Sequence, residues 1–259
     1  MSYEIIDFHT HPFFTPEQNI CKHKEFCDMS VEQTVRDLKV LGIIKICGAV
    51  LCKYESGPIR WEMIEKDNEN ALTMQDILGN FFVPGFQIHP DFVYESCAEI
   101  ERMEALGLRL IGELVPKYRG LFSYDSENMD RILDCAEAHG MIVNFHSLNE
   151  DAMDHMVEKH PHLTLVAAHP GEYNAFMRHM DRMRKSRNYY LDLSGYGILR
   201  HGMLRHGIDL FGPERFIFGS DYPTCNPAMY VGGVALDPTI KEEEKQLILA
   251  GNAKRLLGL

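Results

Sequence analysis

Short apolar runs and longer amphipathic stretches alternate along the whole chain. The apolar runs are rich in Ile, Val and Phe and have the length of buried strands. The stretches between them place apolar residues at helical spacing. The runs predict strands at 3–9, 42–48, 81–87, 108–114, 141–146, 163–169, 189–194 and 215–221. The pattern therefore predicts eight strand–helix units.

Local signals mark where some of the helices begin and end. Ser30 stands three residues before Gln33, which is the spacing of a capping box, and an apolar stripe follows from Val31. A second stripe at 129–136 ends before a glycine, which is a common helix stop. Asp237 followed by Pro238 predicts the start of the last helix.

The number and order of these units indicate the fold. Strands separated by helices pair in parallel, and eight such units normally close into a (β/α)8 TIM barrel. A doubly wound open sheet is the alternative, but it usually has fewer strands. The chain has 259 residues, close to the usual size of one barrel, and no linker or low-complexity tract divides it. We expect an α/β fold with one barrel domain over residues 1–259.

Composition and charge narrow the class of ligand. The chain carries 26 basic and 38 acidic residues, a net charge of -12, which favours a small-molecule substrate and argues against a nucleic-acid partner. The N-terminus has no basic segment followed by a long apolar stretch, so we expect no signal peptide and no membrane span. The seven cysteines are irregularly spaced and are expected to be reduced, which fits a cytoplasmic protein.

Nitrogen and oxygen donors stand at the ends of five predicted strands. The donors are His9, His11, Glu113, His146, His169 and Asp221, and His89 follows the third strand. The carboxyl ends of barrel strands converge at one mouth, and alternate residues such as His9 and His11 face the same side. Zinc, manganese and iron accept such donors. A lone His-x-His pair is a weak motif, but five strand ends in order predict a metal site.

The motifs around these donors resemble the amidohydrolase superfamily, in particular the amidohydrolase-related group that includes decarboxylases. The resemblance covers essentially the whole chain and rests on DFHTHP, VNFHS, VAAHPG, FGSDYP and the closing GNAKRLLGL. It implies a metal held by His9, His11, His146 and Asp221. His169 would then be either a ligand of a second metal or a catalytic group.

The fourth strand departs from part of that pattern. Many binuclear amidohydrolases carry a carboxylated lysine there, whereas RLIGELVP carries Glu113. This strand and the QIHP segment are similar to TatD-type metal-dependent deoxyribonucleases. A carboxylate offers the same anionic oxygens as a carbamate, so Glu113 could bridge two ions. It could also be a salt-bridge partner of a ligand histidine.

The function expected from this site is metal-assisted hydrolysis of an amide, ester or lactone. One or two divalent ions, zinc first and manganese or iron as alternatives, would lower the pKa of a water molecule. Asp221 would act as general base and then acid, and His169 would help to polarise the substrate. The alternatives are decarboxylation of an aromatic or keto acid, TatD-like phosphodiester hydrolysis, and a metal-binding barrel without activity. Two ions per chain would favour hydrolysis over decarboxylation.

Substrate contacts are less strongly indicated. His89, Lys117 and Arg119 are candidate substrate-binding residues, and basic side chains in such loops could bind a carboxylate or phosphate. The segments 13–30 and 49–61 are expected to form part of a lid over the mouth. Cys21, His23 and Cys27 have no spacing typical of a zinc finger. The resemblance further suggests a homodimer.

Overall fold

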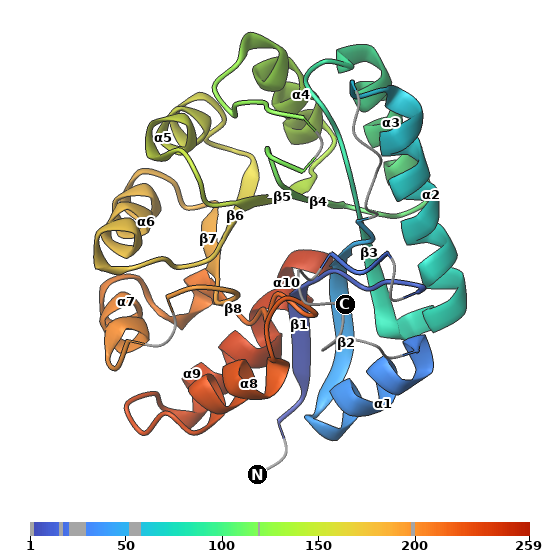
Figure 1. The fold of residues 1–259 in the computed structure, drawn as a ribbon. Helices are drawn as coiled ribbons and strands as arrows, with labels where there is room; N and C mark the ends of the chain where they lie inside the picture. The colour runs from blue at the N-terminus through green and yellow to red at the C-terminus, as the bar shows by residue number, and fades with distance from the viewer. Residues whose placement is uncertain (1–2, 16–17, 21–29, 52–57, 119, 198–199) are drawn as a thin grey trace.

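Eight parallel strands form one sheet that curves into a barrel, with helices around its outside (Figure 1). The computed structural model describes residues 3–15, 18–20, 30–51, 58–118, 120–197 and 200–259. The strands follow one another around the sheet in sequence order: β1 (Ile5–Thr10), β2 (Ile43–Ala49), β3 (Phe82–Phe86), β4 (Leu110–Leu114), β5 (Ile142–His146), β6 (Thr164–Ala168), β7 (Tyr189–Asp192) and β8 (Phe216–Ile217). Each overlaps one of the eight predicted runs.

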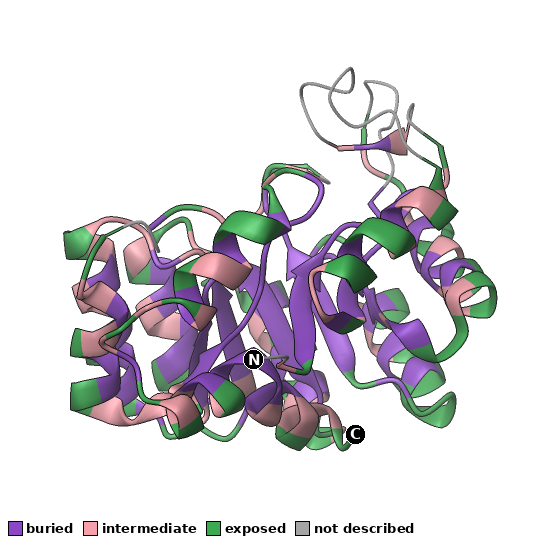
Figure 2. Cartoon of the chain, turned by 90° about the horizontal axis from the view of Figure 1, so that it is seen from below, coloured by how far each residue is buried: buried purple, intermediate pink, exposed green. Residues whose placement is uncertain are grey.

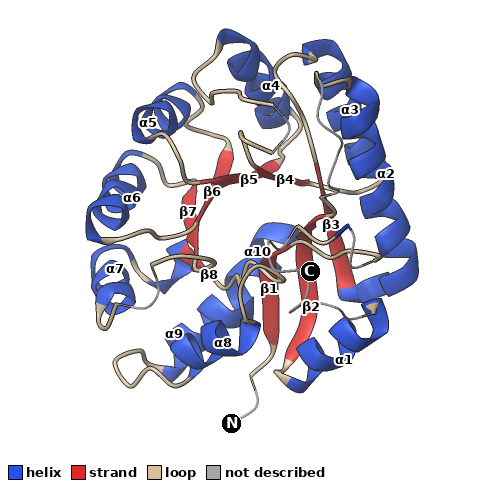
Figure 3. Ribbon diagram, in the orientation of Figure 1, coloured by secondary structure: helices blue, strands red, loops and turns tan. Residues whose placement is uncertain are grey.

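Helices follow every strand and cover the outer face of the sheet (Figure 3). They are α1 (Val31–Val40), α2 (Trp61–Leu78), α3 (Val93–Ala105), α4 (Glu127–Ala138), α5 (Glu150–Lys159), α6 (Tyr173–Lys185), α7 (Met203–Phe211), α8 (Pro227–Ala235), α9 (Glu242–Gln246) and α10 (Asn252–Leu257). In the part of the chain that the structure describes, every helix is too short or too polar to cross a lipid bilayer.

Strand β1 forms hydrogen bonds with the residues that directly follow β8, and these bonds join the two edges of the sheet. The Phe8 amide donates to the Phe218 carbonyl at 2.9 Å, and the Asp221 amide donates to the His9 carbonyl at 2.9 Å. Thr10 and Tyr222 form a parallel bridge just beyond. The predicted strand 215–221 is longer than the observed strand β8. The residues that follow β8 still pair with β1 through these contacts. The (β/α)8 barrel expected from the sequence is confirmed, and the open sheet is excluded.

Buried side chains lie on both faces of the strands, which appear as the purple centre of Figure 2. Outward-facing apolar residues pack under the helices in a large cluster that includes Val143 and Met129. Other side chains point to the barrel axis: Asn144 on β5 donates to Asp192 on β7 at 2.9 Å, although β6 lies between these strands. Side chains from non-adjacent strands meet across the axis, and this places strand-end residues in one site.

Two of the three helix predictions agree with the structure, and the third is wrong. Ser30 caps α1 by accepting from the Gln33 amide at 3.2 Å, and α4 ends one residue before His139, its C-cap. Asp237 and Pro238 do not start a helix. The Asp237 carboxylate accepts instead from the Thr239 amide at 2.8 Å, which makes a turn. The helix begins at Glu242, where three glutamates occupy the first turn.

Candidate metal centre

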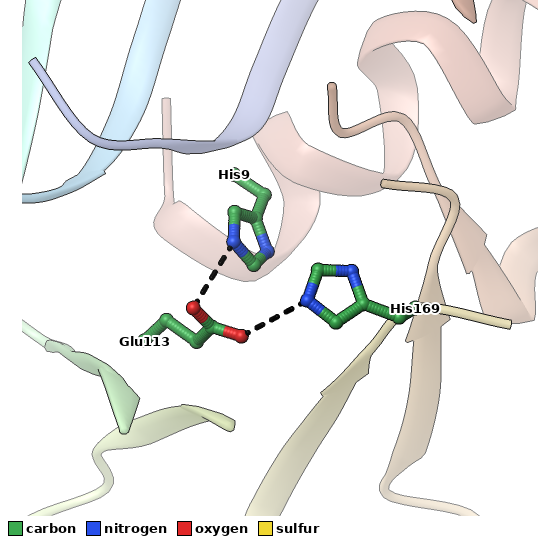
Figure 4. Close-up of side chains that lie close together, drawn as sticks. All are labelled: His9, Glu113 and His169. Atoms are coloured by element: carbon green, nitrogen blue, oxygen red, sulfur yellow. Dashed lines mark ion pairs between the residues drawn. The ribbon is translucent and has the colours of Figure 1, made fainter. Parts of the chain in front are cut away.

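All six predicted metal-site residues come together at the carboxyl ends of the strands. His9 lies near the end of β1 and His11 just after it, Glu113 lies on β4, and His146 is the last residue of β5. His169 directly follows β6, and Asp221 follows β8. The structure therefore places them as the barrel geometry predicted. Figure 4 shows the Glu113 carboxylate between the rings of His9 and His169.

Four donor atoms form a first group around His9 and His11. Their Nε2 atoms are 3.2 Å apart, and each lies within 3.4 Å of Glu113 Oε2. Asp221 Oδ1 lies 3.8 Å from His9 Nε2 and 3.7 Å from His11 Nε2. Ligands held about 2.0–2.2 Å from one ion in a tetrahedral arrangement are separated by roughly 3.4 Å. The donor atoms of His9, His11 and Asp221 lie within 4.8 Å of one another, a spacing that could hold one divalent cation.

A second group shares the same glutamate through its other oxygen. Glu113 Oε1 lies 2.9 Å from His146 Nδ1 and 3.3 Å from His169 Nε2. The two histidine nitrogens are 3.1 Å apart. Each oxygen of the carboxylate thus faces a different pair of histidines. This is the arrangement that a bridging carboxylate requires, so Glu113 is positioned to join two cation subsites as well as to accept hydrogen bonds from the histidines.

The hydrogen bonds behind the rings determine which nitrogens face the centre. His9 Nδ1 lies 2.9 Å from Asp192 Oδ2, and His11 Nδ1 lies 3.3 Å from the Ala49 carbonyl. Both partners only accept hydrogen bonds, so each Nδ1 carries a proton and Nε2 is the ring nitrogen left to bind a cation at the centre. Lone pairs and carboxylate oxygens at these distances repel one another unless a cation lies between them. The donor chemistry therefore fits a metal ion.

The electrostatics of the buried centre also favour a positive charge. Burial opposes protonation of His9, but the carboxylates of Glu113 and Asp192 raise its pKa well above the usual value. Burial likewise acts against ionisation of Glu113, while the neighbouring histidines, His9 foremost, hold the pKa of Glu113 well below its usual value. Asp221 behaves differently, because burial raises its pKa. Asp221 is thus the carboxylate best suited to carry a proton.

Backbone conformation is unusual at two of the six residues. His169 has φ of 67° and Asp221 has φ of 61°, and they are the non-glycine residues with positive φ in the described chain. Such conformations cost about 1–3 kcal/mol and persist where surrounding contacts impose them. Close packing also requires glycine nearby: a Cβ at Gly112 would lie 2.1 Å from the Asn144 carbonyl, and one at Gly195 would lie 2.2 Å from His169 Nδ1.

Residues at the end of β7 support the centre, and the sequence prediction did not include them. The Asp192 carboxylate is fully buried and accepts from His9, Asn144 and Ser194. The Ser194 hydroxyl lies 3.2 Å from His9 Nδ1 and 3.1 Å from His169 Nδ1, and it donates to Asp192. The available signal was the pair of polar residues in the otherwise apolar run YYLDLS at 189–194.

The residues predicted to bind substrate lie elsewhere or outside the described chain. His89 is buried between Phe92 and Phe122, with ring centroids 5.8 and 5.1 Å away, and its Nδ1 accepts from the Asp91 amide. Lys117 is exposed on a turn after β4. Arg119 lies outside the described residues, as do Cys21, His23 and Cys27 and most of the two segments expected at the mouth. A substrate role for these residues stays a prediction.

A cavity of about 510 Å³ opens beside the centre. Its wall includes His146, His169 and Asp221 from the candidate centre, together with Glu150, Tyr196 and Tyr230. This volume lies within the range of small-molecule sites. Asp221 therefore belongs to both the donor group and the wall of the cavity.

Comparisons with known proteins agree with this geometry. The family model described as amidohydrolase matches residues 57–259, and the chain belongs to this family. Among curated proteins none matches the chain. The superfamily expected from the sequence motifs is thus confirmed by the family match and by the barrel.

Solved structures with the same fold cover nearly the whole chain. A TIM-barrel protein from Bordetella bronchiseptica is 20% identical with a TM-score of 0.78, and 98% of each chain is covered. A 2,6-dihydroxybenzoate decarboxylase from Rhizobium is 14% identical with a TM-score of 0.74, covering 99% of each chain. A dihydroxybenzoic acid decarboxylase from Polaromonas sp. JS666, with bound manganese and 2-nitroresorcinol, is 16% identical with a TM-score of 0.68; 99% of this chain and 97% of that chain are covered.

Proposed function

We propose that the chain is a metal-dependent enzyme that decarboxylates a small hydroxylated aromatic acid. The sequence alone favoured hydrolysis, with decarboxylation as an alternative. The similar structures support the alternative more strongly, because two of the three named above are dihydroxybenzoate decarboxylases. The observation that carries the proposal is the position of Asp221, which lies in the wall of the cavity and within 3.8 Å of the His9 and His11 nitrogens.

The residues that would hold a divalent ion are His9, His11 and Glu113, with an Asp221 oxygen beside them. When bound, such an ion would supply positive charge that binds the substrate carboxylate and stabilises developing negative charge. The donor set accepts zinc, manganese or iron. Manganese is the first ion to test, since the similar Polaromonas structure holds it. Zinc, the sequence-based expectation, has no specific support from the comparisons.

Asp221 would carry the proton in the chemical step. Its carboxylate lines the cavity and lies within 3.8 Å of the His9 and His11 nitrogens, where it can exchange a proton with a bound substrate. The proton passes to the ring carbon that bears the carboxylate. The bond between that carbon and the carboxylate then breaks, its electron pair restores the aromatic ring, and carbon dioxide leaves. Asp221 regains a proton from solvent through the cavity, which completes the cycle.

The direct test is product formation by protein loaded with manganese. A panel of mono- and dihydroxybenzoates is incubated with the protein, and carbon dioxide and the corresponding phenol are measured. Asp221→Asn should lower turnover by about 10²- to 10⁴-fold, which is the usual contribution of a proton-transfer group. Asp209→Asn is the matched control, because Asp209 is exposed and pairs with Arg205 on α7. No consumption of any hydroxybenzoate by the loaded wild type contradicts the proposal.

Hydrolysis is the second candidate, and the placement of Glu113 favours it. A carboxylate facing four histidines with two separate oxygens suits a pair of ions, and paired ions are common in hydrolytic sites. In that reaction Asp221 would take a proton from water and pass it to the leaving group. Two ions per chain together with turnover of esters, lactones or amides would support hydrolysis over decarboxylation.

A further inference from the structure

The wall of the cavity beside the candidate centre includes the carboxylates of Glu150 and Asp221. Three of its four hydroxyl groups donate within the protein: Ser147 donates to the Ala168 carbonyl, Tyr196 to Glu172 and Tyr230 to the Gly195 carbonyl, while the fourth belongs to Thr224. Among the described lining residues there is no lysine or arginine. A second anionic group on the substrate next to Glu150 would lie beside a carboxylate of like charge.

Glu150 is the acidic residue of this wall that lies outside the candidate centre. It is the first residue of α5, and its side chain is 36% exposed. Its Oε2 atom accepts from Arg182 Nη2 at 2.5 Å, and the same nitrogen donates to the Glu150 carbonyl at 2.8 Å. In the described part of the chain, Oε1 has no hydrogen-bond partner. One oxygen is therefore fixed, while the other remains available to a ligand.

Arg182 makes this orientation rigid. Its side chain on α6 is completely buried, and its Nε donates to Asp154 at 2.7 Å. A buried guanidinium with fixed partners limits the rotation of the Glu150 carboxylate. A carboxylate held in this way is a preorganised acceptor, which costs little ordering on binding.

Resting on the proposed function, we infer that Glu150 determines specificity by accepting a hydrogen bond from a hydroxyl or amino group on the substrate ring. The substrate class is thus an aromatic acid with one reacting carboxylate and a donor group facing Glu150. Rings with a second carboxylate at that position are excluded by like charge. A hydrogen bond to an ionised acceptor discriminates by about 10- to 100-fold.

The test is a binding series on manganese-loaded protein. Dissociation constants are measured by calorimetry for 2-hydroxybenzoates that carry one hydroxyl, amino, fluoro or carboxylate group at each remaining ring position. At one position, we expect hydroxyl and amino ligands to bind at least about 10-fold more tightly than the fluoro ligand, which cannot donate. The carboxylate ligand should bind most weakly there.

Glu150→Gln should remove most of this preference. The glutamine oxygen can replace Oε2 as acceptor for Arg182, which turns the amide N–H toward the cavity and offers a donor in place of an acceptor. The hydroxyl and amino advantage should fall below about 3-fold, and the carboxylate ligand should gain affinity. Asp181→Asn is the matched control: Asp181 lies on the same helix as Arg182, pairs with Arg184 and does not line this cavity, so the wild-type order should persist.

The outcomes separate the two hypotheses. If all ligands bind the wild type with similar dissociation constants, whatever the added group, the role of Glu150 is wrong and the proposed function is unaffected. Failure of every 2-hydroxybenzoate to bind a metal-loaded wild type removes the proposed function and this inference with it. If the glutamine variant does not fold, Glu150→Asp replaces it. The shorter side chain withdraws the carboxylate by one methylene, so the preference for hydroxyl and amino ligands should weaken.

Discussion

His9 Nδ1 lies 2.9 Å from Oδ2 of Asp192, a residue 183 positions further along the chain. Both oxygens of Asp192 accept hydrogen bonds: Oδ2 from His9 and Asn144, and Oδ1 from Ser194. Only an ionised carboxylate can accept on every side. Asp192 thereby fixes the His9 ring with its Nε2 lone pair facing the centre.

Asp192→Asn should weaken metal binding although it keeps the size of the side chain. In either orientation the amide NH₂ meets donors, from His9 and Asn144 on one side or from Ser194 on the other. We expect the dissociation constant for manganese to rise by about 10- to 100-fold. Competition with a chelator measures it, and Asp209→Asn is the control. An unchanged affinity would show that the His9 orientation does not depend on this carboxylate.

Glu113→Gln should reduce the number of ions that the protein holds. The amide has one neutral oxygen where the two charged oxygens of Glu113 now lie between 2.9 and 3.4 Å from four histidine nitrogens. Metal content after reconstitution and desalting, measured by mass spectrometry, is expected to fall by about one ion per chain, and the remaining affinity by about 10-fold or more. Equal content in variant and wild type would place Glu113 outside the binding group.

Gly195→Ala should disturb His169, whereas Gly202→Ala should not. Both glycines have positive φ, of 60° and 77°, so each substitution should lower the free energy of unfolding by about 1–2 kcal/mol. A Cβ at Gly195 would also lie 2.2 Å from His169 Nδ1, but nothing lies within 4 Å of one at Gly202. Turnover is thus expected to drop only for Gly195→Ala. Equal rates for the two variants would mean that the ring position is unimportant.

The stability of the protein should fall in mild acid because of His179. Its Nδ1 lies 2.7 Å from the Tyr189 hydroxyl, and burial, followed by the charge of Arg182, lowers its pKa from 6.5 to about 3. Between these values the unfolded chain binds more protons than the folded chain. The His179 contribution is complete above pH 6.5 and is lost as the pH falls, by at most about 1.4 kcal/mol per pH unit.

Urea denaturation of wild type and His179→Gln at pH 7.5, 6.5 and 5.5 measures this dependence. The difference between the two unfolding free energies should shrink toward low pH, because only in the wild type does unfolding expose this ring and let it take up a proton. His201→Gln is the matched control, since His201 is exposed. A difference that is constant across the series would refute the assignment.

The sequence predicted the strands and the six donors because both follow from local patterns. His9, Glu113 and Asp221 stand at the ends of apolar runs, and barrel geometry brings such ends together without knowledge of any loop. Asp192 and Ser194 were missed because their partners become neighbours only across the axis of the closed barrel. The helix predicted at Asp237 and Pro238 was wrong because an Asp-Pro pair suits both the start of a helix and a turn. The contacts of the surrounding chain determine which of the two forms.

The reaction could not be decided from the donors. Decarboxylation and hydrolysis both use a cation and a proton carrier, and Asp221 suits either role. The difference depends on the number of ions at Glu113 and on side chains such as Glu150, whose orientation is set by Arg182 on another helix. No local sequence pattern predicts the contact between Glu150 and Arg182.

The seam between β1 and the chain after β8 has a consequence for how the protein is made. Asp221 and the segment that pairs with β1 are synthesised more than two hundred residues after His9 and His11. A growing chain thus exposes two histidines long before their remaining partners exist. The full donor group can form only once the last strand has paired with the first. High metal affinity would therefore appear only when the barrel is closed.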